Sequence, residues 1–361
     1  MIPRKSRTEM AKAELDIRTI DRVLVRSTNW VGDAILTTPA VRAVRKNFPD
    51  AEVSILAKPW VAPVFYNNPD IDHLLVYDSE GRHKGWSGKV RLSKSLREGR
   101  FDLAILLQNA FEAALLAYLA RIPRRLGYKT DGRHLLLTDG VDLEPRLKEV
   151  HETEYYLGIL EGAGLSRAGM ELTLRVSDEE RVEADAFLSK HQVNSGEPLV
   201  GVSPGATYGP AKRWFPDRFA ALCDRLQESS GVSIVILGGP GDAAVADQVA
   251  RSMKNPPVNL CGKTTLRQAI SIIDRCHLFV TNDSGLMHVA AAVDIPLVAI
   301  FGSTNPVTTG PVGTKSHIVR VPMDCSPCLK PRCPEDHRCM EEITVDQVYS
   351  VAKSMLESEG G

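Results

Sequence analysis

Residues 280–292 have the sequence Val-Thr-Asn-Asp-Ser-Gly-Leu-Met-His-Val-Ala-Ala-Ala. The apolar residues from 277 onward predict a buried strand, and the small apolar residues at the end predict a helix packed on a sheet. The turn between them holds Asp283, Ser284 and Gly285. Because a helix N-terminus attracts anions, we predict a phosphate site here, with Ser284 as the cap and Gly285 allowing close approach. His288 would point back to the same place; an ordinary capped helix with a core histidine is the competing interpretation.

The same alternation of strand and helix extends outward in both directions. Strands are expected at 22–27, 51–57, 73–77, 101–108, 199–203, 232–238 and 296–301, and helices at 33–48, 110–121, 216–229, 242–253, 266–276 and 345–357. This alternation is typical of doubly wound parallel sheets. The pattern restarts at residues 171–176 and is followed by a capping box at Ser177. We therefore expect two Rossmann-like α/β domains, 1–172 and 173–361.

Composition limits the classes of protein that fit. The chain has 361 residues, of which 43% are hydrophobic and 25% charged, and its net charge is −1. These values favour a globular protein large enough for two cores and give no nucleic-acid signature. No apolar run is long enough to span a membrane, and the basic start lacks the apolar core of a secretory signal. Scattered cysteines among the seven suggest a reducing compartment, so we expect a cytoplasmic protein.

Three turns of the second half share one chemistry. Thr207 and Lys212 follow the strand at 199–203, a Gly-Gly-Pro-Gly turn follows the strand at 232–238, and the third turn is that at Asp283. Such turns meet at the carboxyl edge of a parallel sheet, where ligands bind. Lys212 together with helix amides would hold a pyrophosphate without a metal. The Gly-x-Gly-x-x-Gly and Walker A fingerprints are absent from this half, which argues against a dehydrogenase or a P-loop enzyme.

The first half offers a carboxylate and two basic segments. Asp33 lies in the first strand-to-helix turn, where it could be a general base or simply an acidic residue that favours the helix dipole. Residues 82–100 and 121–133 are rich in Lys and Arg. They suggest an anionic ligand such as a phosphorylated sugar or a membrane surface, the alternative being solvated helix faces.

A cysteine-proline loop lies near the C-terminus. Cys325, Cys328, Cys333 and Cys339 are separated by two, four and five residues, with prolines between them. Four thiolates at this spacing predict a structural zinc or iron site rather than a catalytic one. Disulfides or free thiols are the other interpretation.

Taken together, these stretches resemble the ADP-heptose:lipopolysaccharide heptosyltransferases of glycosyltransferase family nine, most closely the heptosyltransferase II branch. The matching pieces are residues 26–40, 203–206, 212–214, 281–288, 301–304 and the cysteine-proline loop, in the family's order. The resemblance implies a GT-B architecture, in which two Rossmann-like domains face a cleft. It also implies an inverting enzyme without a catalytic metal, with ADP-heptose as donor and a phosphorylated, lipid-linked oligosaccharide of the lipopolysaccharide core as acceptor.

The resemblance also assigns roles to residues. Asp33 would be the base, and Thr207 and Lys212 would bind phosphate. Asp283, Ser284, Gly285 and His288 would contact the donor, and the acceptor's anionic groups would meet the following arginines: Arg124, Arg125 and Arg133. The enzyme would touch the cytoplasmic face of the inner membrane peripherally.

Two other functions remain open at this point. A protein O-heptosyltransferase would use the same donor with a Ser or Thr acceptor. A non-catalytic nucleotide-sugar-binding module would keep the phosphate turns but would have no need of a carboxylate at position 33.

Overall fold

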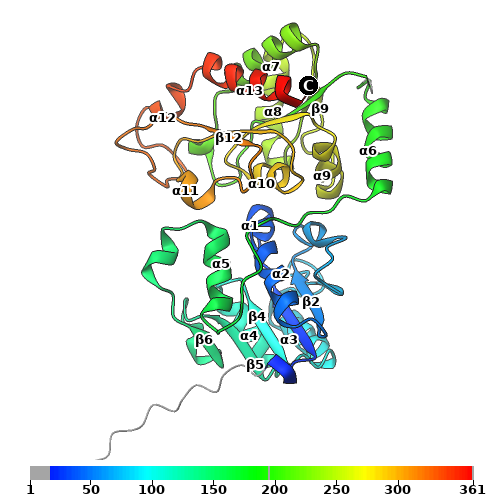
Figure 1. The fold of residues 1–361 in the computed structure, drawn as a ribbon, viewed down its shortest axis with the longest axis vertical. Coiled ribbons are helices and arrows are strands. Elements are labelled where there is room, and N and C mark those ends of the chain that lie inside the picture. The colour runs from blue at the N-terminus through cyan, green and yellow to red at the C-terminus, as the bar shows by residue number, and fades with distance from the viewer. Residues whose placement is uncertain (1–16, 194–195, 360–361) are drawn as a thin grey trace, which may run out of the picture.

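The computed structural model describes residues 17–193 and 196–359, so most of the polar segment 1–20 lies outside it. Two six-stranded sheets, parallel throughout, form the two halves of the molecule (Figure 1). The first sheet has the order β3-β2-β1-β4-β5-β6 and the second β12-β11-β10-β7-β8-β9. In both sheets the chain starts in the middle, runs to one edge, and returns to build the other side. The predicted doubly wound α/β fold is therefore confirmed.

The strands of the first sheet are short and largely buried. They are β1 Arg22–Arg26, β2 Glu52–Ala57, β3 His73–Val76, β4 Leu103–Leu106, β5 Arg124–Tyr128 and β6 Asp139–Val141. The helices of this half are α1 Val31–Leu36, α2 Thr38–Asn47, α3 Gly85–Glu98, α4 Phe111–Leu119 and α5 Glu152–Glu161. Four buried apolar residues in a row make β4, as expected for a parallel strand covered on both faces.

The second half repeats this plan. Its strands are β7 Leu199–Ser203, β8 Ser233–Ile236, β9 Val258–Asn259, β10 Leu278–Asn282, β11 Leu297–Ile300 and β12 Ser316–Val319. Its helices are α6 Asp178–Lys190, α7 Pro216–Ser230, α8 Ala243–Ser252, α9 Leu266–Asp274, α10 Gly285–Ala292, α11 Pro306–Thr309, α12 Arg338–Glu341 and α13 Val345–Glu359. No helix in the described ranges is long and apolar enough to cross a bilayer.

The helix expected at 33–48 is instead two helices, α1 and α2, joined at Thr37. Pro39 has no amide hydrogen and cannot donate to the carbonyl of Ile35, four residues earlier. The hydroxyl of Thr38 donates to that carbonyl at 2.7 Å, and the hydroxyl of Thr37 donates to Ala34 O at 2.6 Å. The side chains thus satisfy the carbonyls where the helix is interrupted.

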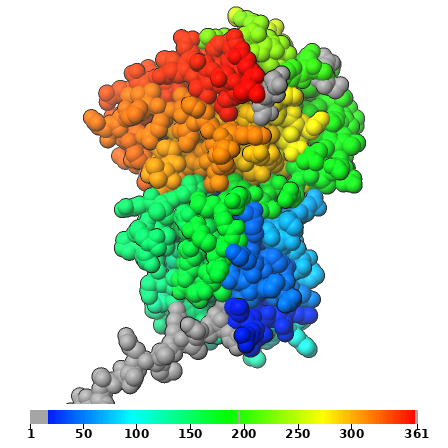
Figure 2. Space-filling view, in the orientation of Figure 1, coloured from blue at the N-terminus to red at the C-terminus, as the bar shows by residue number. Residues whose placement is uncertain are grey.

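The two halves meet closely, as the two lobes joined at a waist in Figure 2 suggest. One hydrophobic cluster runs from Val25 of β1 to Phe279 of β10. At the contact between α1 and α10, a Cβ added to Gly285 would lie 3.5 Å from the Gly32 nitrogen. Glycines at both positions therefore allow the N-termini of the two helices to approach.

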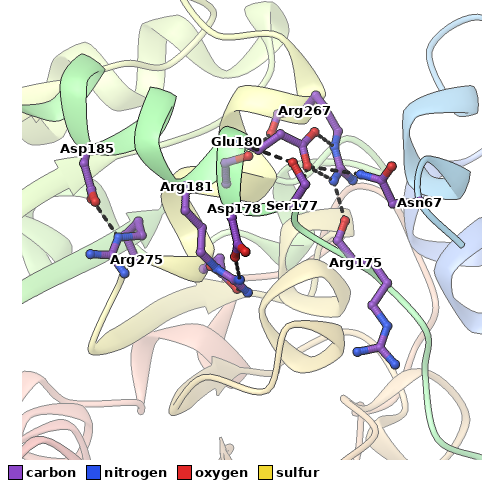
Figure 3. A network of polar contacts seen from close by, with 11 residues as sticks. Asn67, Arg175, Ser177, Asp178, Glu180, Arg181, Asp185, Arg267 and Arg275 are labelled. Atoms are coloured by element: carbon purple, nitrogen blue, oxygen red, sulfur yellow. Dashed lines mark hydrogen bonds and ion pairs between the residues drawn. The ribbon is translucent and has the colours of Figure 1, made fainter.

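A polar network fixes the linker where it enters the second half (Figure 3). Ser177 and Glu180 form the predicted capping box of α6. Arg267 of α9 pairs with Glu180 and donates to the carbonyl of Arg175. The same guanidinium lies 3.3 Å from Pro63 O in the first half. Arg267 thus ties the linker and both halves together.

Candidate active site

The two sheets place their switch points opposite each other. In the first sheet the order of the strands reverses between β1 and β4, and in the second between β7 and β10. Ligands of doubly wound sheets bind beyond the carboxyl ends of strands at such points. Asp33 follows β1, Lys212 follows β7, and Asp283 and His288 follow β10. Residues far apart in the sequence therefore converge at the interface of the halves.

An ion pair holds the phosphate-binding candidates of the second half. Lys212 lies at the end of the 3₁₀ turn Pro210–Lys212, and its Nζ is 2.7 Å from Asp283 Oδ2. The hydroxyl of Thr304 donates to the same oxygen at 2.6 Å. The Asp283 side chain is 5% exposed and that of Lys212 13%. Asp283 thus orients the Lys212 side chain through this ion pair.

Ser284 occupies the N-cap position of α10 but does not cap with its side chain. Its hydroxyl lies 3.1 Å from the hydroxyl of Thr281 instead. The Ser284 side chain therefore does not play the capping role that the sequence predicts. The backbone amides in the first turn of α10 receive no hydrogen bond acceptor from this hydroxyl. Thr207, also expected at this site, is exposed on the loop before Lys212.

Asp33 is a partly buried carboxylate of the first half. It lies in the first turn of α1. Burial, chiefly, raises its pKa from 3.8 to about 6; Lys212 acts against this rise, and Asp283 adds to it. A carboxylate with such a pKa is ionised at neutral pH but is basic enough to accept a proton.

His288 packs across the interface against Gly32. A Cβ on Gly32 would lie 2.8 Å from His288 Cδ2. Burial lowers the pKa of His288 to about 4, so the ring is neutral at physiological pH. Among the described residues its buried Nδ1 has no hydrogen-bond partner. Such an atom suits a ligand that supplies the partner.

The sequence analysis missed Glu152, the first residue of α5. Burial, chiefly, and then Asp33 and Asp283 raise the pKa of Glu152 to about 7. The sequence carries no signal for this, because an acidic residue in a first helical turn is ordinary. Only the packing of α5 against the interface distinguishes it.

The three arginines expected to bind the acceptor are used inside the first half. Arg124 and Arg125 begin β5, at the edge of the sheet opposite the switch point. Arg124 Nε lies 2.9 Å from Asp139 Oδ2, and Arg125 Nε donates to Leu136 O at 2.6 Å. Arg133 is fully buried and donates to Tyr128 O and Asn109 Oδ1 at 2.7 and 2.8 Å. Arg124 and Arg125 thus lie at the amino edge of the sheet, whereas Arg133 is held among residues at the carboxyl ends of β4 and β5.

Other cations lie at the carboxyl edge of the first sheet, where its switch point is. Arg26 ends β1, and Lys58 follows β2. Lys58 Nζ lies 3.6 Å from the centroid of the Tyr77 ring, and burial and then Arg26 lower its pKa to about 8. Exposed aromatic side chains surround the edge, among them Trp30 and Trp60. Arg26 is buried and donates to Leu56 O and Asn29 Oδ1, so Lys58 is the cation of this edge without such hydrogen bonds to the described residues, and the exposed aromatic rings offer stacking surfaces.

The four cysteines of the C-terminal loop surround one cavity of about 210 Å³. All four are free, and burial together with the other three thiols raises the pKa of Cys339 to about 11. Within residues 17–193 and 196–359, no group of three potential ligands is arranged to hold a metal ion. At the expected metal site the four thiols thus line one cavity but are not positioned as a coordination sphere.

The cysteine loop also contacts the loop that carries Lys212. The Tyr208 hydroxyl donates to Leu329 O at 2.8 Å, and Ala211 N donates to Pro331 O at 3.1 Å. A Cβ on Gly209 would lie 2.2 Å from Pro331 O, so only glycine fits there. The cysteine loop therefore packs against the loop that carries Lys212 and supports its conformation.

Two doubly wound sheets with facing switch points form the GT-B architecture of glycosyltransferases, which the matching solved structures share. Comparison with known proteins specifies the family. The chain belongs to glycosyltransferase family 9 (heptosyltransferase), whose model matches residues 89–338.

Relatives and solved structures agree over nearly the whole chain. Lipopolysaccharide heptosyltransferase 2 of Salmonella typhimurium is 31% identical over 351 residues, covering 94% of this chain and 99% of the relative. The structure of Escherichia coli ADP-heptose lps heptosyltransferase II matches with a TM-score of 0.81 and 29% identity, over 94% of this chain and 100% of that one. A family 9 glycosyltransferase from Veillonella parvula matches with a TM-score of 0.86 and 29% identity, over 96% of this chain and 100% of that one.

Proposed function

We propose that this enzyme transfers heptose from ADP-L-glycero-D-manno-heptose to an inner-core heptose of lipopolysaccharide, with inversion at the anomeric carbon. The observation that carries the proposal is the convergence of Asp33 with Lys212 and the N-terminus of α10. The names of the relatives supply the ADP-heptose donor and the lipopolysaccharide acceptor. The division into an acceptor domain, 1–172, and a donor domain, 173–361, is part of the same proposal.

In the proposed reaction Asp33 accepts the proton of the acceptor hydroxyl. The hydroxyl oxygen bonds to the anomeric carbon as the bond from that carbon to the diphosphate oxygen breaks, and ADP leaves. Lys212 and the first amides of α10, near Ser284 and Gly285, stabilise the negative charge that develops on the diphosphate, so no catalytic metal is required. Thr207 adds a hydroxyl to the phosphates.

His288 and Asp283 act within this arrangement in different ways. The neutral ring of His288 offers its free Nδ1 to the donor. Asp283 holds Lys212 in place until the diphosphate competes for the lysine. Closure of the domains would exclude water and so limit hydrolysis of the donor.

For the acceptor we propose the edge that carries Lys58 in place of the three arginines, whose guanidinium groups form hydrogen bonds within the first half. Phosphates of a lipid-linked acceptor would meet the Lys58 ammonium group, and sugar rings would stack on the exposed Trp30 and Trp60. The same mixture of aromatic and basic side chains suits peripheral contact with the cytoplasmic face of the inner membrane.

We further propose that the cysteine loop binds zinc or iron when the thiols deprotonate and draw together. Because the loop supports the segment of Lys212, the metal would stiffen the donor site without touching the reaction. Elemental analysis of protein purified without chelator, compared with a variant in which Cys328 and Cys333 are replaced by Ser, tests this. Metal content equal in the two samples would contradict it.

The function itself is tested by titrating ADP-heptose, ADP-glucose, UDP-glucose and NAD into the protein in a calorimeter. Selective binding of ADP-heptose that weakens strongly in Lys212→Ala is expected. Transfer is then followed by mass spectrometry with a heptose-bearing core acceptor and, in parallel, with a Ser- and Thr-containing protein. Binding of NAD, or modification of the protein acceptor alone, would refute the proposal.

A further inference from the structure

Three exposed apolar side chains lie at the carboxyl edge of the first sheet, and together they are called the apolar row. Trp86 lies in the first turn of α3, Phe111 begins α4, and Leu135 ends the 3₁₀ turn Arg133–Leu135. Their exposed fractions are 62%, 46% and 82%. Large apolar residues are often exposed singly, whereas several on adjoining segments mark an interaction surface.

Side-chain contacts show that the three segments adjoin. The helices α3 and α4 pack against each other (Figure 1). Near the start of each helix, Lys89 of α3 pairs with Glu112 of α4 at 2.7 Å. Arg133 of the 3₁₀ turn donates to Asn109 Oδ1, just before α4, at 2.8 Å. The members of the apolar row therefore share one edge of the molecule.

The segment that carries Trp86 is strongly basic. Residues 82–94 contain five Lys and Arg and no Asp or Glu. Most of these side chains are exposed, among them those of Arg82, Lys84 and Arg91. Glu80 and Asp131, two exposed acidic residues on the adjoining loops, offset part of this charge. Apolar side chains next to an excess of cations suit a surface that is both apolar and anionic.

A bilayer that contains anionic phospholipids has both properties. Its phosphate groups attract Lys and Arg, and the acyl chains just below them accept apolar side chains. Trp is favoured at this depth because its ring is apolar while its N–H group stays among polar groups.

The apolar row is continuous with the proposed acceptor edge. Lys58 Nζ lies 3.6 Å from the centroid of the Tyr77 ring, and the Tyr77 hydroxyl donates to Glu112 Oε1 of α4 at 2.8 Å. A lipid-linked acceptor bound at Lys58 would keep its acyl chains in the bilayer. The surface next to Lys58 is therefore the one that would meet the bilayer.

We propose that Trp86, Phe111 and Leu135 insert into the interfacial layer of an anionic bilayer, while the cations of residues 82–94 bind its phosphates. Docking in this way brings the acceptor edge to the level of the lipid headgroups. The inference rests on the proposed function, which supplies the lipid-linked acceptor. It assigns the membrane contact to a surface beyond Trp30 and Trp60, whose rings remain available to the acceptor.

The four tryptophans of the chain allow the docking to be measured. Trp214 is fully buried, Trp30 and Trp60 belong to the acceptor edge, and Trp86 belongs to the apolar row. In a variant with Trp30→Phe and Trp60→Phe, vesicles of phosphatidylcholine and phosphatidylglycerol with brominated acyl chains should quench the fluorescence, because Trp86 enters the bilayer. Trp86→Phe should lose most of the quenching. Quenching that disappears with Trp30 and Trp60 instead would overturn the inference.

Cosedimentation with unbrominated vesicles of the same lipids measures the affinity. Trp86→Ala and Leu135→Ala are each expected to weaken binding about tenfold, because less apolar surface is buried. Lys84→Glu should weaken it about twentyfold, since each unit of charge near an anionic surface contributes about fivefold. Vesicles of phosphatidylcholine alone should bind far more weakly. An unchanged affinity for ADP checks that each variant is folded.

The matched controls are Arg100→Glu and Tyr118→Ala, which change exposed residues near the other ends of the same two helices. The 14 residues of α3 span about 21 Å, which exceeds a screening length of about 8–10 Å, so Arg100→Glu should bind vesicles like the wild type. Tyr118→Ala should do the same, and losses in the controls equal to those in the apolar row would overturn the inference.

The vesicle assays contain neither donor nor acceptor, so they separate this inference from the proposed function. Wild-type protein that transfers heptose to a water-soluble core acceptor but does not bind anionic vesicles would refute the docking surface alone. Vesicle binding by protein that binds no ADP-heptose would refute the proposed function and leave the docking surface standing.

Discussion

Replacing Asp33 by Asn should abolish transfer and yet stabilise the protein at neutral pH. Burial raises the pKa of Asp33 from 3.8 to about 6. Because the folded-state pKa lies above that of the unfolded chain, ionisation of Asp33 costs the folded state free energy. At about 1.4 kcal/mol per pH unit, the full cost is about 3 kcal/mol. Asn has a similar shape and no charge, so the variant should regain up to this amount.

The sign of the effect depends on pH. Below the unfolded pKa both states are protonated and the cost is absent; it grows between pH 3.8 and about 6 and is complete above that. Thermal unfolding should therefore give equal midpoints for wild type and Asp33→Asn near pH 4. Near pH 8 the variant should unfold at a temperature up to roughly 4 °C higher, given an entropy of unfolding of about 2.1 cal/mol/K per residue over 361 residues.

The matched control is Asp50→Asn, the same change at an exposed turn after α2 and outside the proposed site. A variant less stable than wild type at pH 8, or a gain of the same size at both pH values, would refute the reasoning. Residual transfer near the wild-type rate would remove Asp33 from the role of base.

Three further results are expected. The value of kcat/KM should rise with pH and level off above about 6, because Asp33 accepts a proton only when ionised; a profile that is flat from pH 5 to 8 would contradict this. Gly209→Ala should lower the free energy of unfolding by about 1–3 kcal/mol and weaken ADP binding, because the added Cβ would lie 2.2 Å from Pro331 O. Denaturant titration measures the first effect and calorimetry the second. A variant with unchanged stability and ADP affinity would show that the cysteine loop does not support the loop that carries Lys212. Lys58→Ala should raise the KM of the acceptor about tenfold, whereas Arg124→Ala should leave that KM unchanged. Steady-state kinetics measure both values. A larger rise in KM for Arg124→Ala than for Lys58→Ala would favour the arginines as the acceptor site.

The sequence predicted the doubly wound fold well, because a buried parallel strand such as β4 is a continuous apolar run. It missed β5, which begins with Arg124 and Arg125, since charged residues at a strand end do not resemble a core. It also missed the two-residue strand β9, which is too short to show a period. The break at Thr37 escaped it as well, although Pro39 was visible in the sequence.

The sequence by itself determined which residues end strands and begin helices. That placed Asp33, Lys212 and Asp283 at the ligand-binding edges of their sheets, because the direction of a parallel strand fixes which end carries the turn. Only the tertiary structure decided that Glu152 joins them and that Arg124 lies at the opposite edge. The physical reason is that burial and electrostatic coupling depend on distances between segments far apart in the chain, and a local pattern of residues does not contain those distances.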